Sequence, residues 1–225
     1  MGWTSNIPNE VSEMFIAECV RLQQPALDIG AAFGVAAIPG LAQGAVVLAN
    51  DLDPVHLEVL WQNVPIEHRE RLMLIPGRFP TELSFKPESL GAVHASNVLH
   101  FLTGSEIDLG IRSIATWLVK EGKLFIHAGT PYQQPFSRFI PEYEARVRKG
   151  EAWPGWVDDT CRISNHRKLG QIPPAIHLLD PEVLRRVIQD AGMIVEHAWL
   201  YRRKELPRSM HWDGREGVGV IAKKI

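Results

Sequence analysis

The chain of 225 residues is poor in cysteine and in long apolar runs. Its two cysteines, Cys19 and Cys161, lie far apart and form no CxxC pair, which argues against a disulfide framework and a thiolate zinc site. No apolar run approaches the roughly 20 residues that a membrane-spanning helix needs, and residues 1–9 lack the charged-then-apolar pattern of a secretory signal. We therefore expect a cytoplasmic protein without a membrane partner.

Excess charge of one sign is also missing, because 24 Lys and Arg stand against 26 Asp and Glu, for a net charge of −2. A nucleic-acid binder usually has a stronger basic excess, so the composition favours small-molecule chemistry. The nine histidines form neither an HxxxH nor an HExxH pattern, and we expect no metal site. The length suits a single domain over residues 1–225, as a monomer or a homodimer.

Short apolar runs alternate with amphipathic stretches over the first 128 residues. The predicted strands are 26–29, 46–50, 72–75, 92–96 and 123–128, and the predicted helices are 9–22, 35–43, 54–63 and 105–119. This alternation indicates a parallel sheet covered on both faces. Residues 76–91 contain three prolines, so a helix between the third and fourth strands must be short or absent.

The pattern changes after His127. Residues 129–179 hold six prolines and six aromatic residues without strand alternation, and we expect them to form an inserted cover over the carboxyl edge of the sheet. A helix at 181–191 and strands at 194–200 and 217–222 follow. Two successive strands without a helix between them must pair antiparallel. The predicted fold is a doubly wound α/β domain with a seven-stranded, mostly parallel sheet and a terminal antiparallel hairpin.

The most informative segment is ALDIGAAFG, residues 26–34, where an apolar strand carrying Asp28 runs into a turn of small residues. The small residues fall at Gly30, Ala32 and Gly34, which differs from the GxGxxG of a dinucleotide fingerprint. They let a ligand approach the backbone, and the following helix start offers unpaired amides. Asp28 would repel a pyrophosphate and suits a ligand with an ammonium group.

Other polar segments follow the next strands and should lie at the same edge of the sheet. Asp51 follows the second strand, where a carboxylate can accept hydrogen bonds from ribose hydroxyls, and Leu52 could cover an adenine face. The segments after the third and fourth strands contain Arg78, Phe79, Ser96 and Asn97. Open parallel sheets bind ligands at this edge.

Together these motifs resemble those of the class I S-adenosylmethionine-dependent methyltransferases of the small-molecule type. LDIGAAFG looks like the family's first motif, ANDLDP like its ribose-binding acid, and SNVLHFL like its segment after the fourth strand. WLVKEGKLFI looks like its turn into the fifth strand, with Val-Lys-Glu-Gly in place of Leu-Lys-Pro-Gly. The resemblance spans roughly residues 24–128 and 175–225.

The resemblance implies a Rossmann-like methyltransferase fold with S-adenosylmethionine as cofactor and S-adenosylhomocysteine as product. It implies that Asp51 holds the ribose, with Leu52 beside the adenine, and that the methionine moiety is surrounded by Asp28, Gly30, Ala32 and Gly34. Family members often place an acid after the third strand to bind the adenine amine. This chain has Arg78 there, so Phe79 or a backbone group would take that contact, and Ser96 and Asn97 complete the expected cofactor site.

The implied reaction is methyl transfer to an O, N, C or S atom of a small, partly apolar acceptor. Positioning can lower the barrier by up to about 7–11 kcal/mol, and a general base is needed only if the acceptor loses a proton. The candidate bases are His100, His166 and His177, although the apolar surroundings of His100 favour a core role. The candidate acceptor contacts are Tyr132, Trp153 and Trp156.

Two other functions stay open on the sequence alone. The chain could bind S-adenosylmethionine without methylating, which a pocket that reaches the methyl group and offers a polar acceptor site would argue against. It could also be a nicotinamide-dependent oxidoreductase, although Asp28 and the GxAxG spacing count against this, and NADH binding would decide it.

Overall fold

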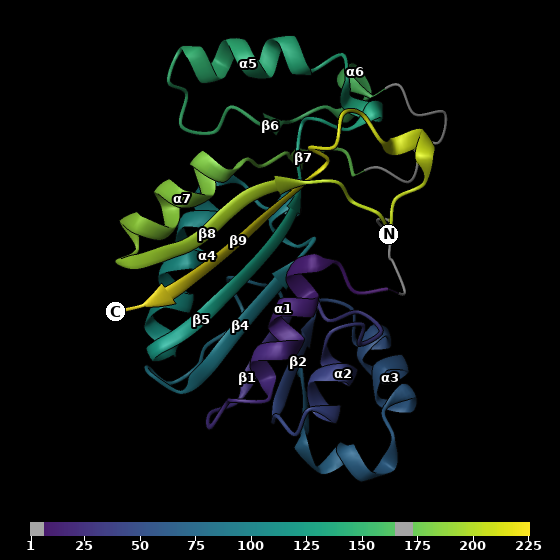
Figure 1. The fold of residues 1–225 in the computed structure, drawn as a ribbon, viewed down its shortest axis with the longest axis vertical. Helices are drawn as coiled ribbons and strands as arrows, with labels where there is room; N and C mark the ends of the chain where they lie inside the picture. The colour runs from purple at the N-terminus through teal and green to yellow at the C-terminus, as the bar shows by residue number, and fades with distance from the viewer. Residues whose placement is uncertain (1–6, 165–172) are drawn as a thin grey trace.

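The computed structural model describes residues 7–164 and 173–225, and its main feature is a seven-stranded sheet in the order β3-β2-β1-β4-β5-β9-β8 (Figure 1). The strands are β1 Ala26–Ile29, β2 Val47–Asp51, β3 Leu72–Pro76, β4 Leu90–Ser96, β5 Leu118–Gly129, β8 Met193–Tyr201 and β9 Gly217–Lys224. Strands β1 to β5 are parallel, and β9 runs antiparallel to both β5 and β8. The predicted sheet and its terminal hairpin are confirmed.

Helices cover both faces of this sheet (Figure 1). One face packs against α1 Glu10–Cys19, α2 Ala37–Ala42 and α3 Pro54–Asn63, and the other against α4 Gly104–Trp117 and α7 Pro181–Asp190. Helices α3 and α7 begin in the same way. An aspartate side chain before a proline, Asp53 in α3 and Asp180 in α7, accepts backbone N–H groups of the first turn.

Several boundaries differ from the prediction. The helix expected at 35–43 begins two residues later, because residues 30–36 form the turn that follows β1. Strand β5 begins at Leu118, directly after α4, where the prediction began it at Lys123. Residues 77–89, all of which are described, contain no helix, as their prolines predicted.

The segment predicted as a cover has secondary structure of its own beyond the carboxyl end of β5 (Figure 1). It contains α5 Ile140–Arg148, α6 Thr160–Ile163 and a small antiparallel pair, β6 Trp156–Val157 with β7 Ile176–His177. The sequence shows no strand alternation in this segment because each of these two strands has only two residues. Its side chains form a separate cluster of Phe136, Phe139, Tyr143, Val157, Ile163, Ile176 and Leu178.

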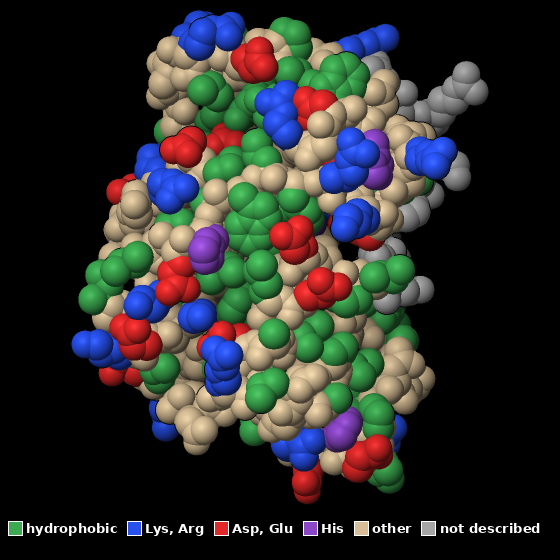
Figure 2. Space-filling model, in the orientation of Figure 1, with side chains coloured by type: hydrophobic (Ala, Val, Ile, Leu, Met, Phe, Trp, Pro, Cys, Tyr) green, Lys and Arg blue, Asp and Glu red, His purple; other side chains and the backbone are tan. Residues whose placement is uncertain are grey.

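The surface carries charge of both signs. On the face shown in Figure 2, basic side chains (blue) and acidic side chains (red) are interspersed. In the described parts of the chain, no helix combines the length and the hydropathy that a membrane crossing requires.

Candidate functional site

The turn after β1 has an unusual backbone. The φ angles of Gly30, Ala32 and Gly34 are 68°, 45° and 91°, in the left-handed region that glycine adopts most easily. A Cβ atom at Gly30 would lie 2.5 Å from Val98 Cγ2, so the turn packs directly against the loop that follows β4. The small residues of this motif are therefore required by the backbone itself, and they leave its peptide groups close to the carboxyl edge.

Asp51 at the end of β2 closes the same turn. Its Oδ2 accepts the N–H of Ala32 at 2.9 Å, and its Oδ1 accepts the N–H of Asp53 at 3.0 Å and lies 3.1 Å from His56 Nδ1. A carboxylate has about four lone-pair positions, so about one is left for a ligand. Leu52 next to it is 66% exposed and free to cover a flat apolar group.

Asp28 is buried in β1 and is bonded within the fold. Its Oδ1 lies 2.7 Å from His94 Nδ1 on β4, and His94 Nε2 lies 3.0 Å from Ser12 Oγ on α1. The Phe15 ring stacks on His94 with 4.7 Å between centroids. The order Ser–His–Asp is that of a hydrolase triad, but all three side chains are buried. The chain of contacts ties α1 to the sheet beneath the turn.

The segment after β3 is placed differently from the expectation. Arg78 is half-exposed and its Nη2 donates to Glu106 Oε1 at 2.7 Å, in the first turn of α4. The Phe79 ring is buried, and a Cβ atom at Gly110 of α4 would lie 2.4 Å from its Cζ. This placement argues against Phe79 as the adenine contact, because its ring faces a helix in the core.

The segment after β4 meets the start of α1. Ser96 Oγ accepts a hydrogen bond from Asn9 Nδ2 at 2.9 Å. Asn97 has a φ of 56°, and its N–H donates to the carbonyl of His127 on β5 at 2.9 Å. Ser96 and Asn97 therefore lie at the centre of the carboxyl edge, between β1 and β5.

The histidines predicted as bases are weakly basic where they are described. Burial lowers the pKa of His100 to about 3, with a smaller effect from Arg203, and burial lowers the pKa of His177 to about 4. His177 Nδ1 lies 3.0 Å from the carbonyl oxygen of Leu102. Such imidazoles are poor proton acceptors at neutral pH, which argues against both as general bases. His166 lies outside the described residues.

The aromatic residues predicted to contact the acceptor divide into two places. Trp153 and Trp156 line a cavity of about 690 Å³, together with Thr103, Gly104, Ser105, Arg146 and Glu151. Both indoles meet the His177 ring edge-on, at centroid distances of 5.1 and 5.5 Å. Tyr132 is not among the residues lining this cavity, and its ring lies under the Arg215 guanidinium, 3.5 Å from the centroid.

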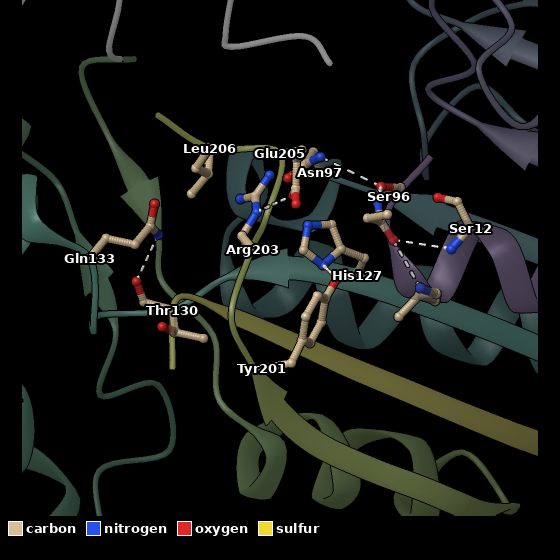
Figure 3. A network of polar contacts seen from close by, with 12 residues as sticks. Ser12, Ser96, Asn97, His127, Thr130, Gln133, Tyr201, Arg203, Glu205 and Leu206 are labelled. Carbon is tan, nitrogen blue, oxygen red and sulfur yellow. Dashed lines mark hydrogen bonds and ion pairs between the residues drawn. The ribbon is translucent and has the colours of Figure 1, made fainter. Parts of the chain in front are cut away.

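Sequence reasoning missed a buried polar cluster at the end of β5. His127 Nδ1 lies 2.7 Å from the Tyr201 hydroxyl, and the Arg203 Nε donates to Glu205 Oε1 at 2.8 Å (Figure 3). Burial holds the pKa of His127 well below its ordinary value, and the Arg203 charge adds to this. His127 could have been noticed near the end of a predicted strand, whereas Arg203 lies in a polar connection without a local signal.

No metal site accompanies these groups. Over residues 7–164 and 173–225, His, Cys, Asp and Glu side chains nowhere gather in threes as a metal ion would need.

Comparison with known proteins gives both a domain and a fold. Residues 27–126 match the family model of a methyltransferase domain. No curated protein matches the sequence. An S-adenosylmethionine-dependent methyltransferase from Methanosarcina mazei superposes with a TM-score of 0.70 at 14% identity, over 94% of this chain and 97% of that chain.

Two further structures have the same fold. One is an S-adenosylmethionine-dependent methyltransferase from Mesorhizobium loti, with a TM-score of 0.63, 17% identity and coverage of 95% of this chain and 98% of that chain. The other is the glycopeptide N-methyltransferase MtfA in complex with S-adenosylmethionine, with a TM-score of 0.62, 16% identity and coverage of 95% and 92%.

Proposed function

Since the chain is a class I S-adenosylmethionine-dependent methyltransferase in its domain and its fold, we propose that it methylates an O, N, C or S atom of a small, partly apolar molecule. The observation that carries this proposal is the left-handed turn of Gly30, Ala32 and Gly34, bonded to the Asp51 carboxylate across the carboxyl edge. S-adenosylmethionine is the methyl donor.

The residues at this edge fit the cofactor in shape and chemistry. The remaining acceptor position of Asp51 suits a ribose hydroxyl, and the exposed Leu52 suits the adenine face. The turn 30–34 would lie along the methionine moiety, with Ser96 and Asn97 on the far side. Asp28 would act through its second carboxylate oxygen, since the first contacts His94. When bound, the cofactor supplies a methyl group on a positively charged sulfur.

The protein's part in the reaction is to place the acceptor. His100 and His177 are uncharged and weakly basic at neutral pH, so we propose that neither removes a proton from the acceptor. Orientation alone can lower the barrier by up to about 7–11 kcal/mol. With no base among the described candidates, we propose an acceptor atom that is already nucleophilic, such as an amine, a thiolate or an ionised oxygen.

The cover would contribute the apolar wall of the acceptor site through Trp153 and Trp156, which line the same cavity. Replacing one wall should weaken acceptor binding without touching the cofactor. We expect Trp156→Ala to raise the KM for the acceptor at least several-fold while the affinity for S-adenosylhomocysteine stays within a factor of two. An equal loss of both would show that Trp156 stabilises the fold instead.

Calorimetric titration with S-adenosylhomocysteine, S-adenosylmethionine and NADH tests the proposed function. The first two should bind with micromolar dissociation constants and NADH should give no heat. A screen of small amines, thiols and acids for release of S-adenosylhomocysteine would then identify the acceptor. Binding of NADH alone would overturn the proposal, and cofactor binding without turnover on any acceptor would favour a non-methylating binder.

A small molecule as the partner, rather than a nucleic acid, is part of the same proposal and agrees with the mixed charge in Figure 2. The cytoplasmic location and the choice between monomer and homodimer stay predictions of the sequence.

A further inference from the structure

Arg203 lies in the connection between β8 and β9, with its side chain on a floor of two glycines. Gly129 ends β5, Gly217 begins β9, and the two are register partners in the sheet. A Cβ atom at Gly217 would lie 2.8 Å from Arg203 Cγ, and one at Gly129 would lie 3.7 Å from Arg203 Nη1. The missing side chains therefore give the guanidinium room to lie directly over the end of the sheet.

The guanidinium is buried but only partly paired. The Arg203 side chain is 8% exposed, and its Nε donates to Glu205 Oε1 at 2.8 Å. Nη1 and Nη2 have no hydrogen-bond partner among the described residues. These two nitrogens form one edge of the planar fork that binds a carboxylate with two parallel hydrogen bonds.

Two histidines that feel the charge of Arg203 add no second positive charge. His127 and His100 are influenced by its charge, and their own lowered pKa values keep them uncharged. His127 Nε2 is buried without a hydrogen-bond partner in the described structure. Figure 3 shows Arg203, Glu205 and His127 together at this edge. A single guanidinium with one free edge fits a carboxylate better than a phosphate dianion, which would need more positive charge.

We propose that Arg203 binds a carboxylate group of a ligand at the carboxyl edge, which rests on the proposed methyltransferase function. Glu205 contacts only the Nε of the guanidinium, so Nη1 and Nη2 can donate two parallel hydrogen bonds to the arriving carboxylate. The carboxylate belongs either to the amino-acid part of the cofactor or to the methyl acceptor.

The test compares Arg203→Met with Arg202→Met, which removes the same charge from the exposed neighbouring residue. Calorimetry uses two probes, S-adenosylhomocysteine and 5′-methylthioadenosine, which lacks the amino-acid part. If the cofactor supplies the carboxylate, Arg203→Met raises the dissociation constant of S-adenosylhomocysteine at least about tenfold and leaves that of 5′-methylthioadenosine unchanged. Arg202→Met changes neither.

If the acceptor supplies the carboxylate, Arg203→Met leaves both nucleosides unaffected. Wild-type protein should then bind at least one of formate, acetate, benzoate and phenylacetate, with and without saturating S-adenosylhomocysteine, and should bind no benzamide or phenylacetamide. Arg203→Met should lose this binding. Unchanged S-adenosylhomocysteine affinity together with no carboxylate binding by the wild type overturns the inference.

The variant Glu205→Gln distinguishes a structural role of the Arg203–Glu205 pair from a role in ligand binding. It removes the negative charge that competes with the ligand carboxylate for Arg203. We expect this variant to bind the carboxylate as well as or better than wild type, whereas a merely structural pair predicts the same loss as in Arg203→Met. If Arg203→Met fails to fold, Arg203→Lys keeps the charge without the fork and should still weaken binding. Wild-type protein that binds neither nucleoside refutes the proposed function, while the carboxylate titration without nucleoside still tests Arg203.

Discussion

The two halves of the carboxyl edge are built in different ways. At β1 and β2, short contiguous segments bond to each other mainly through the backbone, as where Asp51 accepts the N–H groups of Ala32 and Asp53. At β5, β9 and the cover, side chains from distant segments meet, and His127 and His177 each keep a buried Nε2 without a partner in the described structure. Both halves keep unused hydrogen-bonding capacity, which in the first half is one acceptor position of Asp51 and the buried Nε2 of His56. They differ in that backbone contacts between neighbouring segments hold the first half, whereas side chains from distant segments hold the second.

This difference indicates which half of the edge is rigid and which half can vary in sequence. A cofactor used unchanged by many enzymes suits a site made of backbone turns, which tolerate little variation. An acceptor that differs between enzymes suits side chains that can be exchanged without moving a strand. The predictions below test this contrast by disturbing each half in turn.

The largest effect is expected from Gly30→Val in the first half. The residue has a φ of 68°, and its new Cβ would lie 2.5 Å from Val98 Cγ2. Backbone strain and overpacking together should cost about 2–5 kcal/mol in the free energy of unfolding, measured by urea denaturation. Adding Val98→Ala to Gly30→Ala should relieve the clash between the two side chains, while the backbone strain at residue 30 remains. Additive losses in that pair would contradict direct packing between the two loops.

Acid should disturb the second half next. The folded pKa of His177 is about 4, below its ordinary value of 6.5, because burial disfavours the charged ring. Below about pH 6.5 the ring gains a proton in the unfolded state but not in the folded state, which favours unfolding. The free energy of unfolding should therefore be highest above about pH 6.5 and fall by an amount on the order of 3 kcal/mol as the pH falls towards 4. His177→Gln should flatten the dependence of unfolding free energy on pH between 7 and 4.5. Parallel curves for the two proteins would show that His177 does not titrate in this way.

Asp51→Ala should weaken the binding of S-adenosylhomocysteine by about 1–3 kcal/mol, because charge-assisted hydrogen bonds to the ribose and to the turn are lost. The matched control is Asp53→Ala, which removes the N-cap acceptor of α3 and should cost about 0.5–2 kcal/mol of stability without changing affinity. Calorimetry and thermal unfolding of both variants measure the two effects. A folded Asp51→Ala protein with wild-type affinity would refute the ribose assignment.

The smallest effect is expected from Arg78→Ala. Its pair with Glu106 is half-exposed on the arginine side, and such surface pairs contribute about 0–1 kcal/mol. We expect S-adenosylhomocysteine affinity to change by less than a factor of two, as for the exposed Arg112→Ala on α4. A tenfold loss specific to Arg78→Ala would place this side chain on the adenine after all.

The parts of the structure that the sequence predicted are those with local signals. Helix α3 has the predicted bounds because Asp53 and Pro54 mark its start within two residues. The turn after β1 could be predicted because its small residues lie within five positions of the sequence. Gly30, Ala32 and Gly34 each have a positive φ angle, which small residues adopt most easily. Arg78 and Phe79 also lie where predicted along the chain, but their side chains turn towards α4 because tertiary partners there, Glu106 and Gly110, decide their orientation.

The parts that could not be predicted depend on contacts between distant segments. Arg203 meets Gly129 across 74 positions of the chain, and no spacing in either segment indicates the other. The low pKa of His177 arises from burial between Trp153 and Trp156, which required the cover to fold. The periodicity of apolar residues indicates which side chains face the core. It does not indicate which polar side chains meet at the edge of the sheet.

The position of β9 in the sheet also constrains how the molecule can assemble. Strand β9 follows β8 in the chain but pairs between β5 and β8, so β8 reaches the sheet only through a strand that is synthesised after it. Its pairing with β5 closes a loop of nearly ninety residues that includes the whole cover. Such long-range pairing slows folding. On the ribosome, the β1–β5 half can therefore form first, and the glycine floor under Arg203 appears only in the last step.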